Sequence, residues 1–255
     1  MERVNRAPFQ GITNIILFNW HLYAISLAIM SALLIANTFL PGLPGLAAKI
    51  FLLFIVLSIL ISLGVSFYVY DRSDFYSLSW LKSINIGPHA HILNINAGFD
   101  ETSQVLKDKF PQSILTVVDF YDPAKHTEIS IERARKAYPK YPGTFKINTS
   151  DTILPAGSVN CALLIFAAHE IRNDQERIAF FRQIRQTLAI DGQLVIVEHL
   201  RDKYNFFAYN IGAFHFFTRR TWEHTFKAAG FAAWQEGKIN RFVSIFHLKK
   251  DGITT

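Results

Sequence analysis

Two residue pairs in this chain combine a histidine with a carboxylate, the side chains that most often serve as general acids and bases. His169-Glu170 follows one apolar run, and Glu198-His199 ends another. A neighbouring carboxylate favours the protonated form of a histidine and raises its basicity. We expect His199 to be the leading base and His169 the second choice, with Glu198 beside them. Glu170 and Arg172 could instead form a surface ion pair or cap the following helix.

A third group of residues precedes these pairs and has the pattern of a cofactor-binding turn. An apolar run leads into Asn94-Ile-Asn96-Ala-Gly98, and a second apolar run ends at Asp119. Backbone amides of such a turn and an acid after the next strand surround nucleotide-like cofactors at the mouth of a parallel sheet. A full version carries two or three glycines, whereas this turn has Gly98 alone. Asparagine tolerates positive φ, so Asn96 can keep the turn.

The soluble part of the sequence alternates between strand and helix patterns. Expected strands cover 90–95, 113–118, 144–147, 159–166, 193–197, 232–239 and 241–248, and expected helices cover 100–109, 127–137, 173–189 and 221–229. Thr127 is the expected cap of the second helix, and Asn173 or Asp174 that of the third. This alternation predicts an α/β fold, with a Rossmann-like, doubly wound, mostly parallel sheet that ends in an antiparallel edge hairpin.

The N-terminal part of the chain is apolar enough to cross a membrane twice. No Asp, Glu, Lys or Arg occurs from Gly11 to Ala48, and after Lys49 the next charge is Asp71. Each gap covers the roughly 20 apolar residues that a transmembrane helix needs. We expect spans at 15–39 and 46–69, separated by the turn Pro41-Gly-Leu-Pro-Gly45. Residues 1–82 would then form a membrane hairpin and connector, and residues 83–255 the soluble domain.

Basic residues favour a cytoplasmic position for both ends of the hairpin. Arg3 and Arg6 precede it and Arg72 and Lys82 follow it, whereas Lys49 alone lies near the turn. The positive-inside rule therefore predicts a two-span membrane protein whose soluble domain lies in the cytoplasm.

Composition also limits the partners. The net charge of +6 suits an anionic surface, which we expect to be lipid, because no basic patch interleaved with stacking aromatics predicts a nucleic-acid site. Cys161 is the only cysteine and lies in an apolar run, so we expect a buried thiol and no thiolate zinc cluster. We also expect no metal site, because His169 and Glu170 could not both reach one ion from a regular strand. The sequence leaves the oligomeric state open.

Taken with their order and spacing, these motifs resemble class I S-adenosylmethionine-dependent methyltransferases over 86–250. Asn94–Asp100 is similar to the family's glycine-rich first motif, with asparagines in place of an acid and a glycine. Asn148–Pro155 resembles its Asp-Ala-x-x-Leu-Pro segment, and Lys227–Phe231 its x-x-Ala-Gly-Phe segment. The hairpin lies outside the common family pattern.

The resemblance implies S-adenosylmethionine as the cofactor and assigns residues to it. Asp119 would bind the ribose hydroxyls, with Asp122 as the nearby alternative, and Ser150 or Asp151 would contact adenine. The resemblance also places Asn94, Asn96, Gly98 and Phe166 in the cofactor site.

An aromatic insert, Tyr204–Phe217, carries five phenylalanines and no acidic or basic charge. It could be a lid packed on the domain. It could instead line an apolar acceptor pocket or enter the membrane surface beside the hairpin, with Tyr209 and His215 in contact with the acceptor.

Three functions agree with these features. The first is a membrane-anchored methyltransferase for a hydrophobic, membrane-borne acceptor such as a phenol, resorcinol, quinone or lipid, with O-methylation favoured because of the histidines. The second is a nicotinamide-dependent oxidoreductase, which is weakened by the missing Gly-x-Gly-x-x-Gly. The third is a non-catalytic membrane scaffold with a degenerate cofactor site.

Overall fold

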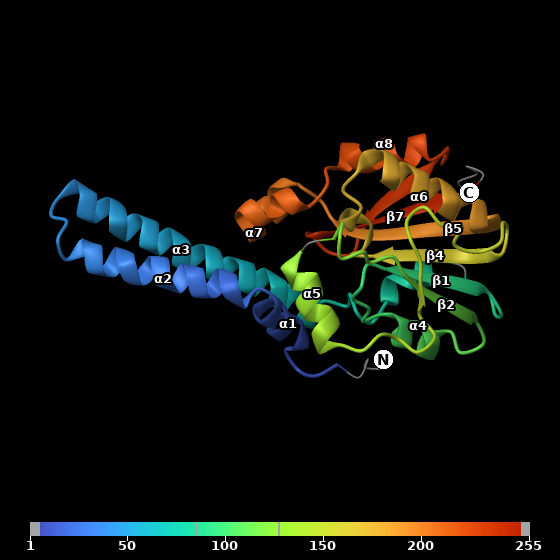
Figure 1. Cartoon of the computed structure of the whole chain (residues 1–255), viewed down its shortest axis with the longest axis horizontal. Helices are drawn as coiled ribbons and strands as arrows, with labels where there is room; N and C mark the ends of the chain where they lie inside the picture. The colour runs from blue at the N-terminus through green and yellow to red at the C-terminus, as the bar shows by residue number, and fades with distance from the viewer. Residues whose placement is uncertain (1–5, 85, 127, 251–255) are drawn as a thin grey trace.

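A seven-stranded sheet with helices on both faces forms the body of the protein, and a long helical hairpin projects from one end (Figure 1). The computed structural model describes residues 6–84, 86–126 and 128–250. The strands are β1 His91–Asn96, β2 Ile114–Asp119, β3 Phe145–Lys146, β4 Val159–Ile165, β5 Leu188–His199, β6 Trp234–Lys238 and β7 Val243–Lys249. The helices of the body are α4 Ser103–Lys109, α5 Ile129–Ala137, α6 Asp174–Thr187, α7 Lys203–Tyr209 and α8 Arg219–Ala228, with short turns η3 Ala168–Glu170 and η4 Asn210–His215.

The strand order is β3-β2-β1-β4-β5-β7-β6. The first five strands run parallel, and β7 pairs antiparallel with both β5 and β6. The order therefore reverses between β1 and β4. In open α/β sheets, ligands bind outside the carboxyl ends of the strands at such a switch point.

Two hydrophobic clusters cover the two faces of the sheet. On one face, the amphipathic helices α6 and α8 bury Phe181, Trp222 and Phe226 against the strands. On the other face, Phe75 and Leu78 of the connector after the hairpin pack against β4, β5 and β7. The connector is therefore part of the core, and the expected boundary at residue 82 cuts through a packed cluster.

The expected strands and helices are present, with shifted ends. The strand β5 begins at Leu188 rather than at 193, and its pairing with β4 is interrupted between Leu188 and Gln193. The backbone of Gly192 lies close to that of Ala189, so the expected turn at Asp191-Gly192 is present within the strand. Asn173 caps α6 by accepting a hydrogen bond from the Glu176 amide, as expected. The expected cap Thr127 lies outside the described residues. Cys161 is buried, also as expected.

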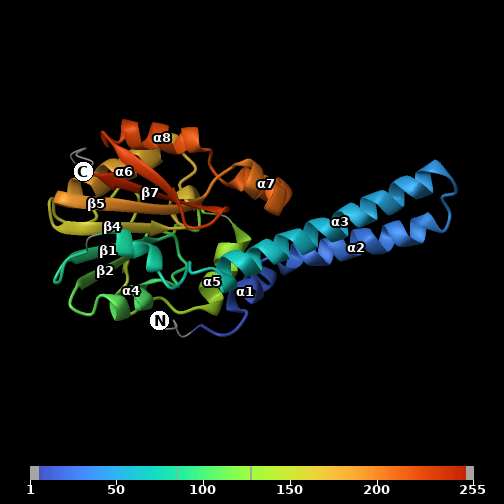
Figure 2. The ribbon, with the colours of Figure 1, turned by 180° about the vertical axis from the view of Figure 1, so that it is seen from behind.

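The hairpin consists of α2 (Trp20–Asn37) and α3 (Leu43–Phe67), which continues as the short π-helix η1 (Tyr68–Arg72). Figures 1 and 2 show both helices extending together away from the sheet. None of the α2 residues 20–37 is buried. Eighteen residues span roughly 27 Å, close to the thickness of a bilayer core. Both helices are long and apolar enough to cross a membrane.

The first expected span is divided at Asn19, so that only its second part belongs to the hairpin. Residues Gln10–Phe18 form a separate helix, α1, which lies against the body. The amides of Gly11 and Ile12 donate to the Asp71 carboxylate at 2.7 and 2.8 Å. The expected span from residue 15 therefore includes the end of α1, where Phe18 is buried and Ile16 and Leu17 are exposed.

Candidate active site

The turn after β1 is held by its own polar side chains. Asn94 donates to the hydroxyls of Thr102 and Ser103 at 3.0 and 2.8 Å, and the Asn96 side-chain oxygen accepts from the Gly98 amide at 3.1 Å. Gly98 has a φ of 97°, and a Cβ atom there would lie 2.5 Å from an Arg135 nitrogen. The backbone conformation requires glycine, whereas the Arg135 side chain is flexible and could move aside.

Asp119 ends β2 beside this turn and is already paired. Its carboxylate lies 2.9 Å from Arg135 and 2.8 Å from Lys140, and it accepts from the Tyr121 amide. Burial raises the pKa of Asp119, but these hydrogen bonds more than offset burial, so the pKa lies below its ordinary value. Arg135 also donates to the Gly98 carbonyl at 3.3 Å.

Arg135 thus fills the space between the turn and the acid of β2. Its guanidinium lies 4.3 Å from the centre of the Tyr121 ring. The cavity left beside Gly98 measures only about 30 Å³. The Arg135 side chain is 23% exposed and belongs to the outer helix α5, so it can leave this position without disturbing the core.

A much larger cavity, of about 480 Å³, lies on the other side of the turn. It extends from the turn past the ends of β4 and β5 to the base of the hairpin. Its lining comes from α1, α2, α3, the β1 turn, the β4 end and the aromatic insert, and includes Phe18, Leu22, Ser66, Tyr70, Asn96, Phe166, His169, Glu170, His199, Tyr209 and His215. Most of the wall is apolar, with polar groups concentrated near the strand ends.

His169 lies between two carboxylates at one side of this cavity. Its Nδ1 is 2.7 Å from Glu198, and its Nε2 is 3.2 Å from Glu170. Burial lowers the pKa of His169, but the two carboxylates outweigh burial and raise it to about 10. The same contacts hold the pKa of Glu170 well below its usual range despite its burial. His169 is therefore protonated at neutral pH and is not a free base, contrary to its expected role as second choice.

His199 is not paired with its sequence neighbour Glu198. Successive side chains of a strand point to opposite faces, and Glu198 turns to His169 while His199 faces the other way. The His199 ring lies between Phe166 and Phe216, with centroid distances of 4.8 and 4.9 Å. Burial lowers its pKa to about 4, so the ring is neutral at pH 7.

The tautomer of His199 follows from its partners. Nδ1 lies 2.9 Å from the Phe242 carbonyl and 3.2 Å from the Asn205 side-chain oxygen, so it carries the proton. Nε2 is then an acceptor, and the Tyr70 hydroxyl donates to it at 2.8 Å. Since both Tyr70 and His199 line the cavity, they form a neutral proton-accepting pair at its wall.

The helix α1 closes the cavity above the β1 turn through Glu101. This carboxylate accepts from Arg6 at 2.8 Å, Gln10 at 3.0 Å and Tyr76 at 2.6 Å. The contact joins the segment before the hairpin to the turn that follows β1.

Replacing Glu101 with alanine should release α1 while leaving the sheet folded. The variant loses these hydrogen bonds and leaves the Arg6 guanidinium without its Glu101 acceptor. The free energy of unfolding should therefore fall by about 2–4 kcal/mol. Limited proteolysis should then cut within residues 6–18 faster than in the wild type. The exposed-surface variant Glu132→Ala serves as the control, and equal cleavage of all three proteins would contradict this role of Glu101.

No protein-family model matches this sequence, and no curated protein matches it. Solved structures do resemble it. An S-adenosylmethionine-dependent methyltransferase of Aquifex aeolicus superposes with a TM-score of 0.51 at 12% identity, covering 71% of this chain and 90% of that one. The body of the protein, formed by the seven-stranded sheet and its helices, has the class I methyltransferase fold.

Two further structures agree with that assignment of the fold. A candidate O-methyltransferase of Nostoc punctiforme gives a TM-score of 0.51 at 14% identity, covering 75% of this chain and 59% of that one. One chain of a complex between a methyltransferase and its Trm112 activator from Haloferax volcanii gives 0.50 at 10% identity, covering 72% and 92%.

Within this fold, the structure gathers most of the residues expected from the sequence around the large cavity. Asn94, Asn96, Phe166, His169, His199, Tyr209 and His215 line it. Gly98 and Asp119 lie together at the neighbouring crevice. Glu198 is fully buried behind His169 and positions that ring instead of facing the cavity.

Ser150 and Asp151 lie apart from this group. Both are exposed, and neither is among the described residues that line the two cavities. The Asp151 carboxylate accepts from the Asn148 amide, so it closes a local turn. The expected contact of these residues with adenine has no support in this arrangement.

Sequence reasoning missed Tyr70, Glu101 and Arg135. Tyr70 lies at the end of an apolar helix, where an interfacial role is the ordinary interpretation. Arg135 is one of several basic residues on α5, and nothing in its spacing distinguishes it. Only Glu101, which follows the β1 turn directly, has a position that could have drawn attention.

Proposed function

We propose that this protein is a membrane-anchored S-adenosylmethionine-dependent methyltransferase whose acceptor is a hydrophobic molecule with an ionisable hydroxyl. The observation that carries the proposal is the cavity of about 480 Å³. It adjoins the β1 turn at one end and the base of the hairpin at the other. A single cavity therefore connects the proposed cofactor crevice with the part of the protein that would face the membrane.

The residues at the crevice suit a nucleoside once Arg135 has moved. Gly98 has no Cβ, so the backbone of the turn can approach a bound nucleoside closely. Asp119 offers a carboxylate of the kind that accepts hydrogen bonds from ribose hydroxyls. S-adenosylmethionine supplies an electrophilic methyl group when it is bound. The protein has to align the acceptor oxygen with that group, exclude water and accept the hydroxyl proton.

His199 is the best-placed proton acceptor. It is neutral, its Nε2 carries no proton, and its partner Tyr70 contacts the cavity. The acceptor's proton can reach His199 through the Tyr70 hydroxyl. The apolar wall formed by Phe18, Leu22 and Phe166 excludes water from this end.

The hairpin and the aromatic insert support a membrane-borne acceptor. The hairpin helices expose apolar side chains along their length, and α7 lies on the same side of the body (Figure 2). Phe207, Ile211 and Phe214 of the insert are 66%, 82% and 56% exposed. A surface of this kind is suited to the headgroup and acyl boundary of a bilayer. The cavity reaches this region through Leu22, Tyr23 and Ser66.

Calorimetric titration of the detergent-purified protein with S-adenosylhomocysteine and with NADH tests the cofactor. We expect saturable binding of S-adenosylhomocysteine and none of NADH. The reversed strand β7 supports this choice, because dinucleotide-binding sheets have the order 3-2-1-4-5-6 without it. Binding of NADH alone would overturn the proposal.

A non-catalytic scaffold is the second function that an observation favours. Arg135 occupies the crevice and pairs with Asp119, as it would in a site that no longer binds a nucleoside. If neither the wild type nor Arg135→Gln binds S-adenosylhomocysteine or NADH, the scaffold is favoured over both enzymes.

Replacing His199 with glutamine should lower methyl transfer about 10²- to 10⁴-fold, the usual contribution of a general base. Glutamine can keep the hydrogen bond to Tyr70 but cannot accept a proton. The measurement is transfer of labelled methyl groups from S-adenosylmethionine to a membrane lipid extract. S-adenosylhomocysteine affinity should stay unchanged, and the exposed variant His224→Gln should keep full activity. Full activity of His199→Gln would remove His199 from the mechanism.

A further inference from the structure

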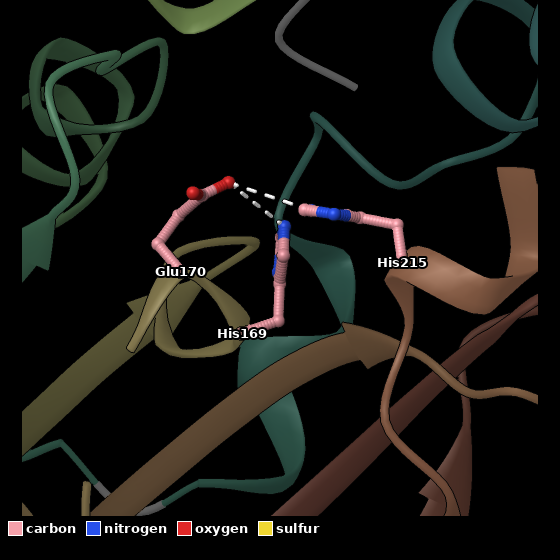
Figure 3. Close-up of side chains that lie close together, drawn as sticks. All are labelled: His169, Glu170 and His215. Atoms are coloured by element: carbon pink, nitrogen blue, oxygen red, sulfur yellow. Dashed lines mark ion pairs between the residues drawn. The ribbon is translucent and has the colours of Figure 1, made fainter. Parts of the chain in front are cut away.

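Three side chains from two separate segments converge at the wall of the large cavity. His169 and Glu170 follow β4, and His215 is the last residue of the turn η4 in the aromatic insert (Figure 3). His169 Nε2 lies 3.2 Å from a Glu170 oxygen, and His215 Nε2 lies 3.6 Å from the same oxygen. One ligand atom from each residue lies within 4.8 Å of the others.

Adjacent residues can converge here because they do not lie on a strand. Residues Ala168–Glu170 form a 3₁₀ turn, in which neighbouring side chains are not forced to opposite faces as in a strand. The geometric reason for expecting no metal site, that His169 and Glu170 continue a regular strand, is therefore wrong.

The other nitrogen of each histidine is held by a different carboxylate. His169 Nδ1 lies 2.7 Å from Glu198, and His215 Nδ1 lies 3.0 Å from Glu128. Both Nε2 atoms are thereby directed to Glu170. Carboxylates that hold the outer nitrogen of a metal-binding histidine fix its tautomer and orientation in this way.

The inner atoms of the cluster are held by ion-pair contacts alone. Among the described residues, neither the facing Glu170 oxygen nor His215 Nε2 has a hydrogen bond of good geometry, and their contacts are the ion pairs of 3.2 and 3.6 Å. Glu170 is only 3% exposed, so this oxygen is not satisfied by bulk solvent. A buried polar atom without a hydrogen bond of good geometry carries a cost that a bound ion would remove.

The Arg172 side chain also links the two segments by bridging their backbone carbonyls. Arg172 donates to the His169 carbonyl at 3.1 Å and to the His215 carbonyl at 2.6 Å. Three carboxylates, Glu128, Glu170 and Glu198, contact the two histidine rings, and Arg172 and Arg201 are the arginines nearby.

We propose that His169, Glu170 and His215 bind a divalent first-row transition-metal ion. Two of the three ligand separations, 3.2 and 3.6 Å, lie close to the value of about 3.3 Å expected between ligands about 2.0–2.1 Å from a tetrahedral ion, and all three ligand atoms lie within 4.8 Å of one another. Two imidazoles and one carboxylate suit zinc, iron or cobalt better than magnesium, which prefers oxygen ligands. The ion takes the place of the proton on His169 Nε2.

The three ligands leave at least one coordination position open, and all three residues line the large cavity. The ligand for that position is an anionic or neutral oxygen, such as a phenolate or an enolate of the acceptor. This role in holding the acceptor rests on the proposed function, whereas binding of the ion does not.

Metal content and calorimetry of the tag-free, detergent-purified full chain test the proposal. After treatment with chelator, Zn²⁺ should bind with one equivalent per chain, and Mg²⁺ should bind much more weakly. Co²⁺ should give the visible absorption of a four- or five-coordinate site. Zinc affinity should fall at least 100-fold in Glu170→Gln and His215→Ala, and about 10- to 100-fold in Glu128→Gln, which alters only an outer contact. His224→Ala, an exposed histidine, is the control.

His215 is 25% exposed at its side chain, so His215→Ala should fold even if changes at the buried His169 or Glu170 do not. Less than 0.2 equivalent of zinc on the wild type, or equal zinc affinity in the wild type and His215→Ala, would overturn the site. Titration with S-adenosylhomocysteine in the absence of metal reports separately on the proposed function. A protein that binds zinc but not S-adenosylhomocysteine keeps the metal site and loses the methyltransferase assignment.

Discussion

Asp119→Asn should weaken binding of S-adenosylhomocysteine about 10- to 100-fold, the effect of losing hydrogen bonds to a charged group. The carboxylate is the acceptor we assign to the ribose hydroxyls, and asparagine keeps its shape but loses its charge. Calorimetry of the two purified proteins measures the difference.

Arg135→Gln should act in the opposite direction. In the free protein Arg135 competes with the nucleoside for Asp119 and for the space above Gly98. Removing its charge should therefore tighten S-adenosylhomocysteine binding several-fold. Lys136→Gln, an exposed change on the same helix, is the matched control, since among the residues that the structure describes Lys136 pairs with Glu132 alone.

The two variants together decide whether this crevice holds the nucleoside. Asp119→Asn also loses its ion pairs with Arg135 and Lys140, so its folding should be checked by thermal unfolding before titration. A folded Asp119→Asn protein that binds as tightly as the wild type would contradict the ribose assignment. Weaker binding in Arg135→Gln would show that Arg135 contacts the ligand instead of competing with it.

Arginine at the middle of both hairpin helices should remove most of the protein from the membrane. Ile29 in α2 and Phe54 in α3 are 43% and 57% exposed, so both face the surroundings of the hairpin. Each charge costs about 2.5–3.5 kcal/mol at the centre of a spanning helix, and the double variant about twice that. The measured quantity is the fraction of protein that stays in the membrane pellet after an alkaline carbonate wash.

Ile190→Arg is the control for this experiment. Ile190 is 78% exposed on the body, far along β5 from the strand ends that line the cavity, so the same charge there should leave the pelleted fraction unchanged. If wild type and double variant pellet equally, the hairpin is not a membrane anchor and its apolar surface has another partner.

Much of the site was predictable because strand ends in a parallel sheet meet at one edge. Gly98 and Asp119 follow neighbouring strands, so local patterns alone place them together. The same reasoning brings His169 and Glu198 near each other, since β4 pairs with β5. It could not say which side chains pair, because that depends on the face to which each one points.

The sequence predictions were wrong where the backbone changes direction or type of helix without a change in the residue pattern. The apolar run 15–39 gave no sign of the break at Asn19, because α1 packs on the body with side chains as apolar as those of α2. The prediction of no metal ion at His169-Glu170 assumes strand geometry, whereas these residues follow the strand and belong to a 3₁₀ turn that begins at Ala168. Hydrophobic composition and periodicity indicate that a segment is buried. They do not distinguish burial in protein from burial in lipid, because both environments favour apolar residues.

The sequence alone determined the α/β alternation, the apolar hairpin, and the glycine and acid of the crevice. These features depend on periodicity and on residue type within a few positions. The tertiary structure decided that Arg135 fills that crevice, that Tyr70 contacts His199, and that His215 meets His169 and Glu170. Each of these contacts joins segments at least 16 residues apart through the orientation of side chains, which no local pattern specifies.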